Sequence, residues 1–212
     1  MKAASGRKVM TTFYFVRHGE TEANKAGILQ GQMDIPLSEK GRRQARAVSA
    51  ALSPVRLDAI YSSDLSRARE TAEAIAEGRG IPVFLDERLR ELNMGAISGL
   101  TIQQSRERFP EFHKELERDP YGTRRPGGGE SRLDVRARVE SLLDEIYERH
   151  KDGAVAVVSH GGPINAVLGI ASQDGTWPRL VVDNCSITVV ERGDFGWRMV
   201  KLNDTEHLKD VE

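Results

Sequence analysis

Short apolar runs of strand length alternate with amphipathic segments along most of this chain. The runs that predict strands cover residues 12–17, 57–61, 81–85 and 154–159. The segments with helical spacing cover residues 39–52, the stretch from the capping cluster 62–64 to about 77, residues 102–118 and residues 131–150. This alternation predicts an α/β fold with a mostly parallel sheet and helices on both faces.

Two parts of the pattern refine this prediction. Residues 154–159 form a continuous run of valine and alanine, which is typical of a strand in the middle of a parallel sheet. The alternating runs 186–191 and 197–202 predict a C-terminal hairpin. We expect Trp197 in this hairpin to pack into the core. A dimer contact is the alternative use of the hairpin, which leaves a homodimer open.

Local signals mark several element boundaries. Ser38 is an expected N-cap for the helix over residues 39–52, which Gly41 weakens slightly. The glycines of residues 78–80 end the next helix. Residues 91–101 are polar without a clear period, and the proline and glycines of residues 124–129 predict a loop.

Length and charge limit the classes of protein to consider. The 212 residues predict a single domain over residues 12–208, preceded by a disordered tail over residues 1–11. A net charge of −1 gives no reason to expect a nucleic-acid partner, and no run approaches the ~20 apolar residues of a membrane span. Cys185 is the one cysteine and has no partner for an intramolecular disulfide, which fits a cytoplasmic location.

Two predicted strands end in a histidine followed by glycine. Arg17-His18-Gly19 follows the first strand, and His160-Gly161-Gly162 follows the strand over residues 154–159. In a doubly wound sheet the carboxyl ends of such strands can lie side by side although they are far apart in sequence. We therefore expect the two imidazoles at one rim of the sheet.

Three interpretations of this histidine pair are open at this point. Metal binding is disfavoured because no zinc-like spacing or carboxylate ligand set accompanies the histidines. A structural role, in which each imidazole satisfies nearby backbone groups, would suffice for either histidine alone. In the third interpretation a neutral imidazole attacks phosphorus and forms a phosphohistidine, which requires positive charge around the transferred group.

Two arginines supply that charge. Arg17 precedes His18, and Arg67 lies at the start of the helix after the second strand, where free amide groups also favour an anion. Each guanidinium can hold two phosphoryl oxygens. Both cations also favour the neutral form of His18, the form with a lone pair to attack. A surface ion pair with Asp64 or Glu70 is the alternative for Arg67, and we assign Arg69 to such a pair.

Five blocks of the sequence together resemble the histidine phosphatase superfamily, the group that includes the cofactor-dependent phosphoglycerate mutases. In chain order they are residues 17–24 (Arg-His-Gly-Glu-Thr-Glu-Ala-Asn), residues 29–41, residues 62–68, residues 89–95 and residues 157–162. The resemblance runs from Phe13 to about Leu208. It implies a phosphoglycerate mutase-like fold with no metal or organic cofactor.

The resemblance also implies roles for individual residues. His18 would be the nucleophile, and Glu91 the acid and base. The groups that would hold the phosphoryl oxygens are Arg17, Arg67, His160 with the adjacent Gly161, and Asn24, which adds a neutral hydrogen bond. Gln30 and Gly31 would line the mouth of the site, or else form a plain turn. Glu130 matches a family motif to which we assign a structural role near the active-site lid.

The type of reaction follows less directly from the resemblance. Mutases of this group usually have serine and tryptophan where this chain has Thr21 and Ala23, and they carry a longer substrate loop. These differences favour a phosphatase that acts on small phosphorylated metabolites, with phosphoglycerate mutase as the alternative. A non-catalytic phosphate-binding protein is a third, less favoured hypothesis, since His18 and Glu91 are both present. Arg124 and Arg125 are candidates to bind a substrate carboxylate, although solvated loop arginines are the simpler interpretation.

Overall fold

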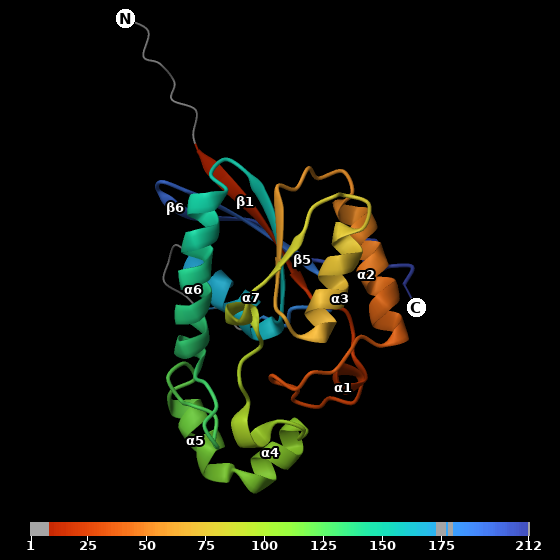
Figure 1. The fold of residues 1–212 in the computed structure, drawn as a ribbon. Coiled ribbons are helices and arrows are strands. Elements are labelled where there is room, and N and C mark those ends of the chain that lie inside the picture. The colour runs from red at the N-terminus through yellow and green to blue at the C-terminus, as the bar shows by residue number, and fades with distance from the viewer. Residues whose placement is uncertain (1–8, 173–176, 178–179, 212) are drawn as a thin grey trace, which may run out of the picture.

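A six-stranded sheet runs through the protein, and helices cover both of its faces (Figure 1). The structure is a computed structural model that describes residues 9–172, 177 and 180–211. The strand order is β3-β2-β4-β1-β5-β6. The strands are β1 (Met10–Arg17), β2 (Ala59–Ser62), β3 (Val83–Leu85), β4 (Ala154–Ser159), β5 (Ile187–Gly193) and β6 (Gly196–Asp204).

Four neighbouring strands run parallel, and the last two form an antiparallel hairpin. β3, β2, β4 and β1 pair in parallel, β5 pairs antiparallel with β1, and β6 pairs antiparallel with β5 at the edge of the sheet. The α/β fold, the mostly parallel sheet and the C-terminal hairpin predicted from the sequence are therefore confirmed.

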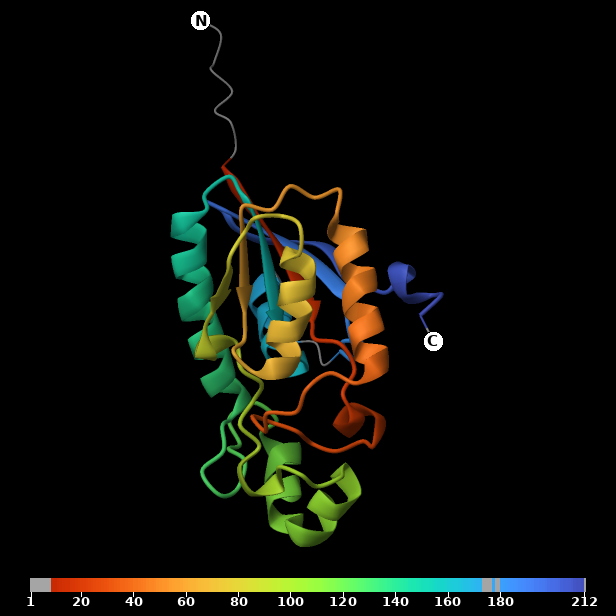
Figure 2. The same cartoon turned by 45° about the vertical axis from the view of Figure 1, so that its right-hand side comes forward.

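The long helices form two layers on opposite sides of the sheet (Figures 1 and 2). One layer holds α6 (Arg132–Arg149) and α7 (Gly161–Ala171), and the other holds α2 (Glu39–Leu52) and α3 (Ser66–Ala76). The shorter helices are α1 (Glu22–Lys25), α4 (Ile102–Arg108) and α5 (Pro110–Arg118), with 3-10 turns at Glu87–Leu89, Gly95–Ile97 and Glu206–Leu208.

No helix in the described ranges is long and apolar enough to cross a membrane. The cytoplasmic location stays a prediction.

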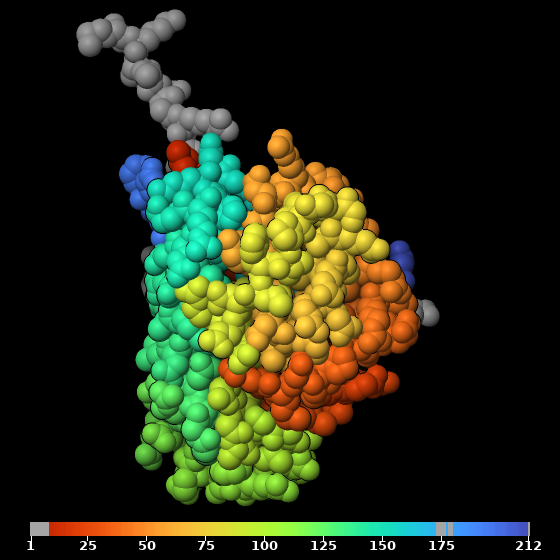
Figure 3. Space-filling model, viewed as in Figure 1, coloured from red at the N-terminus to blue at the C-terminus, as the bar shows by residue number. Residues whose placement is uncertain are grey.

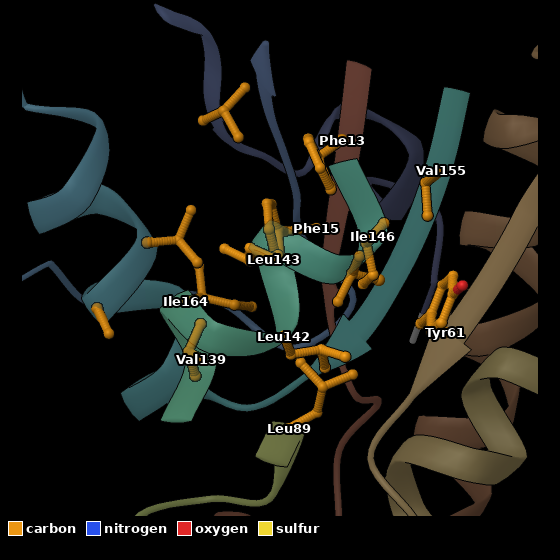
Figure 4. Packing of buried hydrophobic residues seen from close by; sticks show 14 of the residues in the cluster. Phe13, Phe15, Tyr61, Leu89, Val139, Leu142, Leu143, Ile146, Val155 and Ile164 are labelled. Atoms are coloured by element: carbon orange, nitrogen blue, oxygen red, sulfur yellow. The ribbon is translucent and has the colours of Figure 1, made fainter. Parts of the chain in front are cut away.

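Alternate residues of the central strands serve two separate cores. Val155 and Val157 of β4 face the α6–α7 layer, whereas Ala156 and Val158 face the α2–α3 layer. This period of two is the geometry of an extended strand, and it explains why β4 is a continuous apolar run. Figure 4 shows the first of these cores, where Leu143 and Ile146 of α6 pack toward Phe13 and Phe15 of β1.

Most element boundaries agree with the sequence predictions, and the differences have simple causes. α2 and β4 have the predicted bounds, and Trp197 packs against the core beside Phe13. β1 begins at Met10, so residues 10 and 11 belong to the sheet and not to the predicted tail. Residues 1–8 of that tail lie outside the described residues.

Two helices were absent from the sequence prediction. α1 has only four residues, too few to show a period. α7 is buried on almost every side, so its sequence is apolar throughout and lacks the polar face that identifies an amphipathic helix.

The carboxyl ends of β1, β4 and β2 lie at one end of the sheet, next to the segment that follows β1. In Figures 2 and 3 this segment and the α4–α5 segment cover that end of the molecule together. Backbone hydrogen bonds join the two segments, from the amide of Leu29 to the carbonyl of Leu100 (2.9 Å) and from the amide of Gly99 to the carbonyl of Leu29 (2.9 Å). The two segments thus lie together over the end of the sheet that carries the two histidines.

Gly19 and Gly41 let the turn after β1 lie directly on α2. A Cβ atom on Gly41 would stand 2.0 Å from the carbonyl oxygen of Glu20, and one on Gly19 would stand 2.5 Å from the carbonyl oxygen of Gly41. Both distances are shorter than any van der Waals contact. The cost of a glycine inside α2 is therefore offset by the position that it permits for the loop after His18.

We predict that Gly41→Ala lowers the free energy of unfolding by about 1–3 kcal/mol, because the added methyl group meets backbone atoms. The sign of this change in the free energy of unfolding distinguishes the two cases, since alanine in place of glycine at an unconstrained helix position stabilises a protein by about 0.5–1 kcal/mol. Denaturant unfolding followed by circular dichroism measures the change. Arg46→Ala at an exposed position of α2 is the control and should change stability by less than about 0.5 kcal/mol. A stabilised Gly41→Ala variant would contradict the close approach.

Candidate active site

The pairing of β1 with β4 brings His18 and His160 together. The register aligns Arg17, the last residue of β1, with Ser159, the last residue of β4. The residue that follows each strand is a histidine. The amide of His18 donates a hydrogen bond to the carbonyl of Ser159 (2.9 Å), and the two imidazole centroids lie 5.0 Å apart. The predicted meeting of the two imidazoles at one rim is observed, and both side chains are almost completely buried.

The hydrogen bonding of His18 fixes which ring nitrogen holds the proton. Nδ1 lies 2.7 Å from the carbonyl oxygen of Gly19, and a carbonyl can only accept, so Nδ1 carries the hydrogen. In the neutral ring the lone pair is then on Nε2. The amide of Gly19 donates to the hydroxyl of Thr71 (3.1 Å), which holds this turn against α3. The arrangement presents Nε2 as a nucleophile in a fixed direction.

Burial and nearby cations keep both histidines neutral. Burial lowers the pKa of His18 well below its ordinary value of 6.5, and Arg17 and Arg67 lower it further, against the opposing effect of the hydrogen bond that His18 donates to the carbonyl of Gly19. Burial also lowers the pKa of His160 well below 6.5, assisted by Arg67, His18 and Arg17. Neutral imidazoles retain the lone pair that nucleophilic attack requires.

Arg17 and Arg67 are held by backbone carbonyl groups instead of carboxylates. Arg17 donates to the carbonyl of Val182. Arg67 is 1% exposed and donates to the carbonyls of Met33 (2.7 Å) and Gly31 (2.8 Å). Its alternative assignment to a surface ion pair is therefore wrong, whereas Arg69 does pair with Glu73 at the surface (3.7 Å). These carbonyls orient the two guanidinium groups without placing a carboxylate in hydrogen-bond contact with either of them.

Several buried polar atoms at this rim have no hydrogen-bond partner within the described part of the chain. They are Nε of Arg17, Nε of Arg67 and both ring nitrogens of His160. The neutral His160 ring has one N–H, so these atoms supply three donors without partners. Buried donors without partners are costly, and three of them around one nucleophile point to a bound group that would satisfy them. The first residues of α7, which follow His160, add the positive end of a helix dipole. An anion with several oxygens fits this set of donors.

Asn24 lies at the same rim, and its side-chain oxygen already accepts hydrogen bonds within the protein. Oδ1 accepts from the amide of Thr21 (3.2 Å), from the Thr21 hydroxyl (3.1 Å) and from Nδ2 of Asn184 (3.3 Å). The side-chain amino group of Asn24 is therefore the part suited to an anion. Asn184 also donates to the carbonyl of His18 (2.9 Å) and so supports both residues. No motif in the sequence indicated Asn184.

Gln30 and Gly31 lie in a turn, which a hydrogen bond from the amide of Met33 to the carbonyl of Gln30 closes (3.0 Å). Gln30 is buried, and its Oε1 has no partner among the described residues. Gly31 has a φ of +52° and supplies the carbonyl that holds Arg67. The contribution of Gly31 is thus made through its backbone, and the predicted role of both residues at the mouth of the site stays a prediction.

Glu91 stands at the start of α7, on the side of the rim beyond His160. Its Oε1 accepts from the amide of Gly162 (3.0 Å) and from the amide of Leu92 (2.8 Å). A Cβ atom on Gly162 would stand 2.2 Å from this oxygen, which explains the second glycine after His160. The half-buried carboxylate is therefore fixed next to the anion site.

Arg138 and Glu130 hold the backbone around Glu91. Arg138 donates to the carbonyls of Glu91 (3.1 Å) and Arg88 (2.6 Å) and pairs with Glu130 (2.9 Å), whose other oxygen accepts from the amide of Asn93 (2.8 Å). Glu130 thus has the structural position expected from its motif. Arg138 was not singled out in the sequence, because one more arginine on the amphipathic helix α6 carries no distinguishing signal.

A pocket of about 310 Å³ opens beside Glu91. Arg125 lines it and is 7% exposed, so the interpretation of Arg125 as a solvated loop residue is wrong. Arg124 instead points outward and pairs with Asp134 (3.0 Å). Within the described ranges, no group of three or more histidine, cysteine, aspartate or glutamate side chains gathers closely enough to bind a metal ion.

Comparison with known proteins agrees with this geometry. A family model of the histidine phosphatase superfamily (branch 1) matches residues 13–205. Phosphoserine phosphatase 1 of Hydrogenobacter thermophilus is 36% identical over 203 residues, which cover 94% of this chain and 95% of that protein. The probable phosphoglycerate mutase GpmB of Escherichia fergusonii is 35% identical over 206 residues, with coverage of 94% and 95%.

A solved structure extends the similarity to the fold. The structure of Bacillus stearothermophilus YhfR superposes with a TM-score of 0.85 at 34% identity, covering 94% of this chain and 100% of that one. The chain therefore belongs to the histidine phosphatase superfamily, branch 1. It is an enzyme of the group that the five sequence blocks resemble.

We predict that the protein loses stability as the pH falls below about 6.5, because the unfolded chain then binds protons on His18 and His160 while the folded protein does not. Each histidine contributes up to about 1.4 kcal/mol per pH unit, between its unfolded pKa and its lower folded pKa. Denaturant unfolding in phosphate-free buffer at pH 7.5, 6.5 and 5.5 measures the slope.

The double variant His18→Asn/His160→Asn should have a shallower slope over the same range. His113 and His150, whose pKa values burial also lowers, remain in the variant and account for the residual slope. An unchanged slope in the double variant would show that the two histidines do not fold in the neutral form.

Proposed function

We propose that the protein is a metal-independent phosphomonoesterase that hydrolyses small phosphorylated metabolites through a phosphohistidine on His18. The single observation that carries the proposal is the set of unpartnered buried donors on Arg17, Arg67 and His160 around the Nε2 lone pair of His18. A phosphoryl group has three oxygens to accept from these donors, and its phosphorus is the electrophile that a neutral imidazole attacks.

In the first step, Nε2 of His18 forms a bond to phosphorus as the bond from phosphorus to the ester oxygen breaks. Arg17 and Arg67 balance the charge on the phosphoryl oxygens, and Asn24 and His160 donate further hydrogen bonds. Glu91, in its acid form, gives its proton to the departing oxygen, because an alkoxide is a poor leaving group. The hydrogen bond from Nδ1 of His18 to Gly19 supports the positive charge on the ring.

In the second step, water attacks the phosphohistidine. The Glu91 carboxylate takes one proton from this water, the bond from Nε2 to phosphorus breaks, and inorganic phosphate leaves with the original lone pair restored to Nε2. The step requires water to reach phosphorus beside Glu91. Leu180 and Val181, at the rim of the adjoining pocket, are 37% and 81% exposed, which supports access from solvent.

Phosphoglycerate mutase is the second candidate, because the GpmB relative is as similar to this chain as the phosphoserine phosphatase. A mutase must keep its phosphohistidine from water, whereas a phosphatase must admit water. The exposed rim of the pocket supports the phosphatase, and Thr21 and Ala23 stand where mutases of this group usually have serine and tryptophan.

We predict that the purified protein releases phosphate from phosphomonoesters in the presence of EDTA, and that His18→Asn lowers kcat/KM at least about a thousandfold because the nucleophile is lost. Rapid quench with a ³²P-labelled ester should trap label on the wild-type protein in a form stable to base and labile to acid. His150→Asn, at the opposite end of the sheet, is the matched control and should keep the label. Transfer between two positions of phosphoglycerate without net phosphate release would instead establish the mutase.

We predict that Glu91→Gln lowers kcat/KM by about 10²–10⁴-fold for an alkyl phosphate, and by much less for 4-nitrophenyl phosphate. The nitrophenolate leaves without a proton, so only the alkyl ester needs the acid in the first step. Steady-state kinetics with both esters measure the two losses, and Glu87→Gln at an exposed position is the control. Equal losses for the two esters would exclude proton donation by Glu91 to the leaving group.

A further inference from the structure

A tight turn over residues 183–186, between α7 and β5, lies against the end of β1. A backbone hydrogen bond of 3.1 Å between its first and last residues closes the turn. Its third residue, Cys185, is buried and has a φ of +54°, a conformation that is unfavourable for a residue with a side chain. The amide of Cys185 donates to the carbonyls of Arg17 (2.9 Å) and His18 (3.3 Å). The turn is thus held in a strained conformation in direct contact with the proposed nucleophile.

The second residue of the turn, Asn184, connects two parts of the proposed site. Its Nδ2 lies 2.9 Å from the carbonyl oxygen of His18 and 3.3 Å from Oδ1 of Asn24. A backbone carbonyl only accepts hydrogen bonds, so the Asn184 atom that faces it is the amino group. This group has two hydrogens and can donate to both oxygens at once. Asn184 therefore links the backbone of the nucleophile to the side chain of Asn24.

The orientation of the Asn24 side chain depends on the donors around its oxygen. Two of them belong to Thr21, which forms the capping box of α1 with Asn24 (3.2 Å and 3.1 Å). Because α1 has only four residues, this single turn is not stable by itself. Asn184 adds a donor from 160 residues away in the chain and so ties α1 to the sheet. With Oδ1 held, the amino group of Asn24 is the end left to donate to a phosphoryl oxygen.

Other contacts hold the main chain on either side of Asn184. The amide of Asp183 donates to Oδ1 of Asn203 in β6 (2.8 Å), and Nδ2 of Asn203 donates back to Oδ2 of Asp183 (2.7 Å). The carbonyl of Val182 accepts from the side chain of Arg17. The turn therefore presents the Asn184 side chain from a fixed backbone. Within the described ranges, Asn203 bonds to this turn but forms no hydrogen bond to His18 or Asn24.

We infer that Asn184 is a positioning residue for the proposed phosphoryl site. Its amino group fixes the backbone of His18 and keeps the Asn24 amino group directed at the phosphoryl oxygens. Asn184 itself touches no reacting atom and transfers no proton. This assignment rests on the proposed function, because the anion whose binding Asn184 supports is the phosphoryl group of that reaction.

Two variants separate the hydrogen bonds of Asn184 from its volume. Asn184→Ala removes the donor and most of the side chain, whereas Asn184→Leu keeps a similar size at this half-buried position but cannot donate. We expect each variant to weaken the binding of inorganic phosphate about five- to tenfold, as measured by calorimetric titration. Wild-type affinity in Asn184→Leu would show that Asn184 only fills space, and would overturn the assignment.

The same variants should affect turnover more than binding. We expect kcat/KM for 4-nitrophenyl phosphate to fall at least about tenfold, with a loss in kcat, because a loosened nucleophile is less often aligned with phosphorus. A change confined to KM would overturn the part of the assignment that concerns the backbone of His18.

A double-mutant cycle tests whether Asn184 acts on the anion through Asn24. In an Asn24→Ala background, the further change Asn184→Ala should weaken phosphate binding by less than about twofold, since the side chain that it orients is already gone. Equal losses of phosphate affinity in the two backgrounds would overturn the link between Asn184 and Asn24.

Asn203→Gly is the matched control, because it removes the other asparagine side chain that holds the same turn. Glycine suits the φ of +47° at this position. We expect this variant to unfold at lower denaturant concentration but to bind phosphate within about twofold of the wild-type affinity. A loss of affinity as large as that of Asn184→Ala would assign the effect to loosening of the turn and overturn the specific role of Asn184.

Phosphate binding needs no turnover, so these measurements separate the inference from the proposed function. The expected series of affinities in a protein that hydrolyses no ester would overturn the phosphatase and support the role of Asn184. Hydrolysis by the wild-type protein, with phosphate affinity and kcat/KM unchanged in both Asn184 variants, would overturn that role and leave the phosphatase. A wild-type protein that neither binds phosphate nor hydrolyses any ester would overturn both.

Discussion

The parallel pairing of β1 with β4 is the constraint on which the rest of the site depends. One register places Arg17 opposite Ser159, and a slip of one residue would send His18 and His160 to opposite faces of the sheet. The register is fixed because alternate residues of both strands serve two different cores, so a slip would exchange the residues of each. The packing of the two hydrophobic cores fixes the strand register, and this register in turn places the two histidines next to each other.

The rim of the sheet concentrates positive charge in a dry environment, and the protein tolerates this because of how the charges are held. Backbone carbonyls orient Arg17 and Arg67, while both imidazoles remain neutral through burial. The price is the set of buried donors that lack a partner until an anion binds. A carboxylate hydrogen-bonded to either arginine would have removed that cost, and with it much of the attraction that we propose for a phosphoryl group. The cost of these unpartnered donors and the attraction for an anion that we propose thus have one origin.

The sequence predicted most strands and helices well, because local patterns of apolar residues and capping residues determine where these elements begin and end. The continuous apolar run of residues 154–159 and the helical spacing within residues 39–52 predicted β4 and α2 with their observed bounds. Helix α7 was missed because its burial on almost every side removes the amphipathic pattern.

At the site, the residues that stand in motifs could all be identified from the sequence, and their roles stay predictions. They are Arg17, His18, Arg67, Glu91 and His160. Asn184 and Arg138 lie in no motif, and only tertiary contacts bring them to the site. The burial of Arg125 depends on the packing of its loop against the segment of Glu91, which no local pattern encodes.

Glu91 marks the boundary between two parts of the site that obey different requirements. On one side are the groups that we propose bind the phosphoryl group, and they occupy strand ends and helix starts, the most rigid parts of an α/β fold. On the other side is the pocket that we propose for the leaving group, whose described lining comes from the loop of Arg125, the start of α6 and residues after α7. Relatives named as phosphoserine phosphatase and as probable phosphoglycerate mutase are about equally similar to this chain, at 36% and 35% identity. Differences in the second part can therefore redirect the enzyme to another ester while the geometry around His18 stays unchanged.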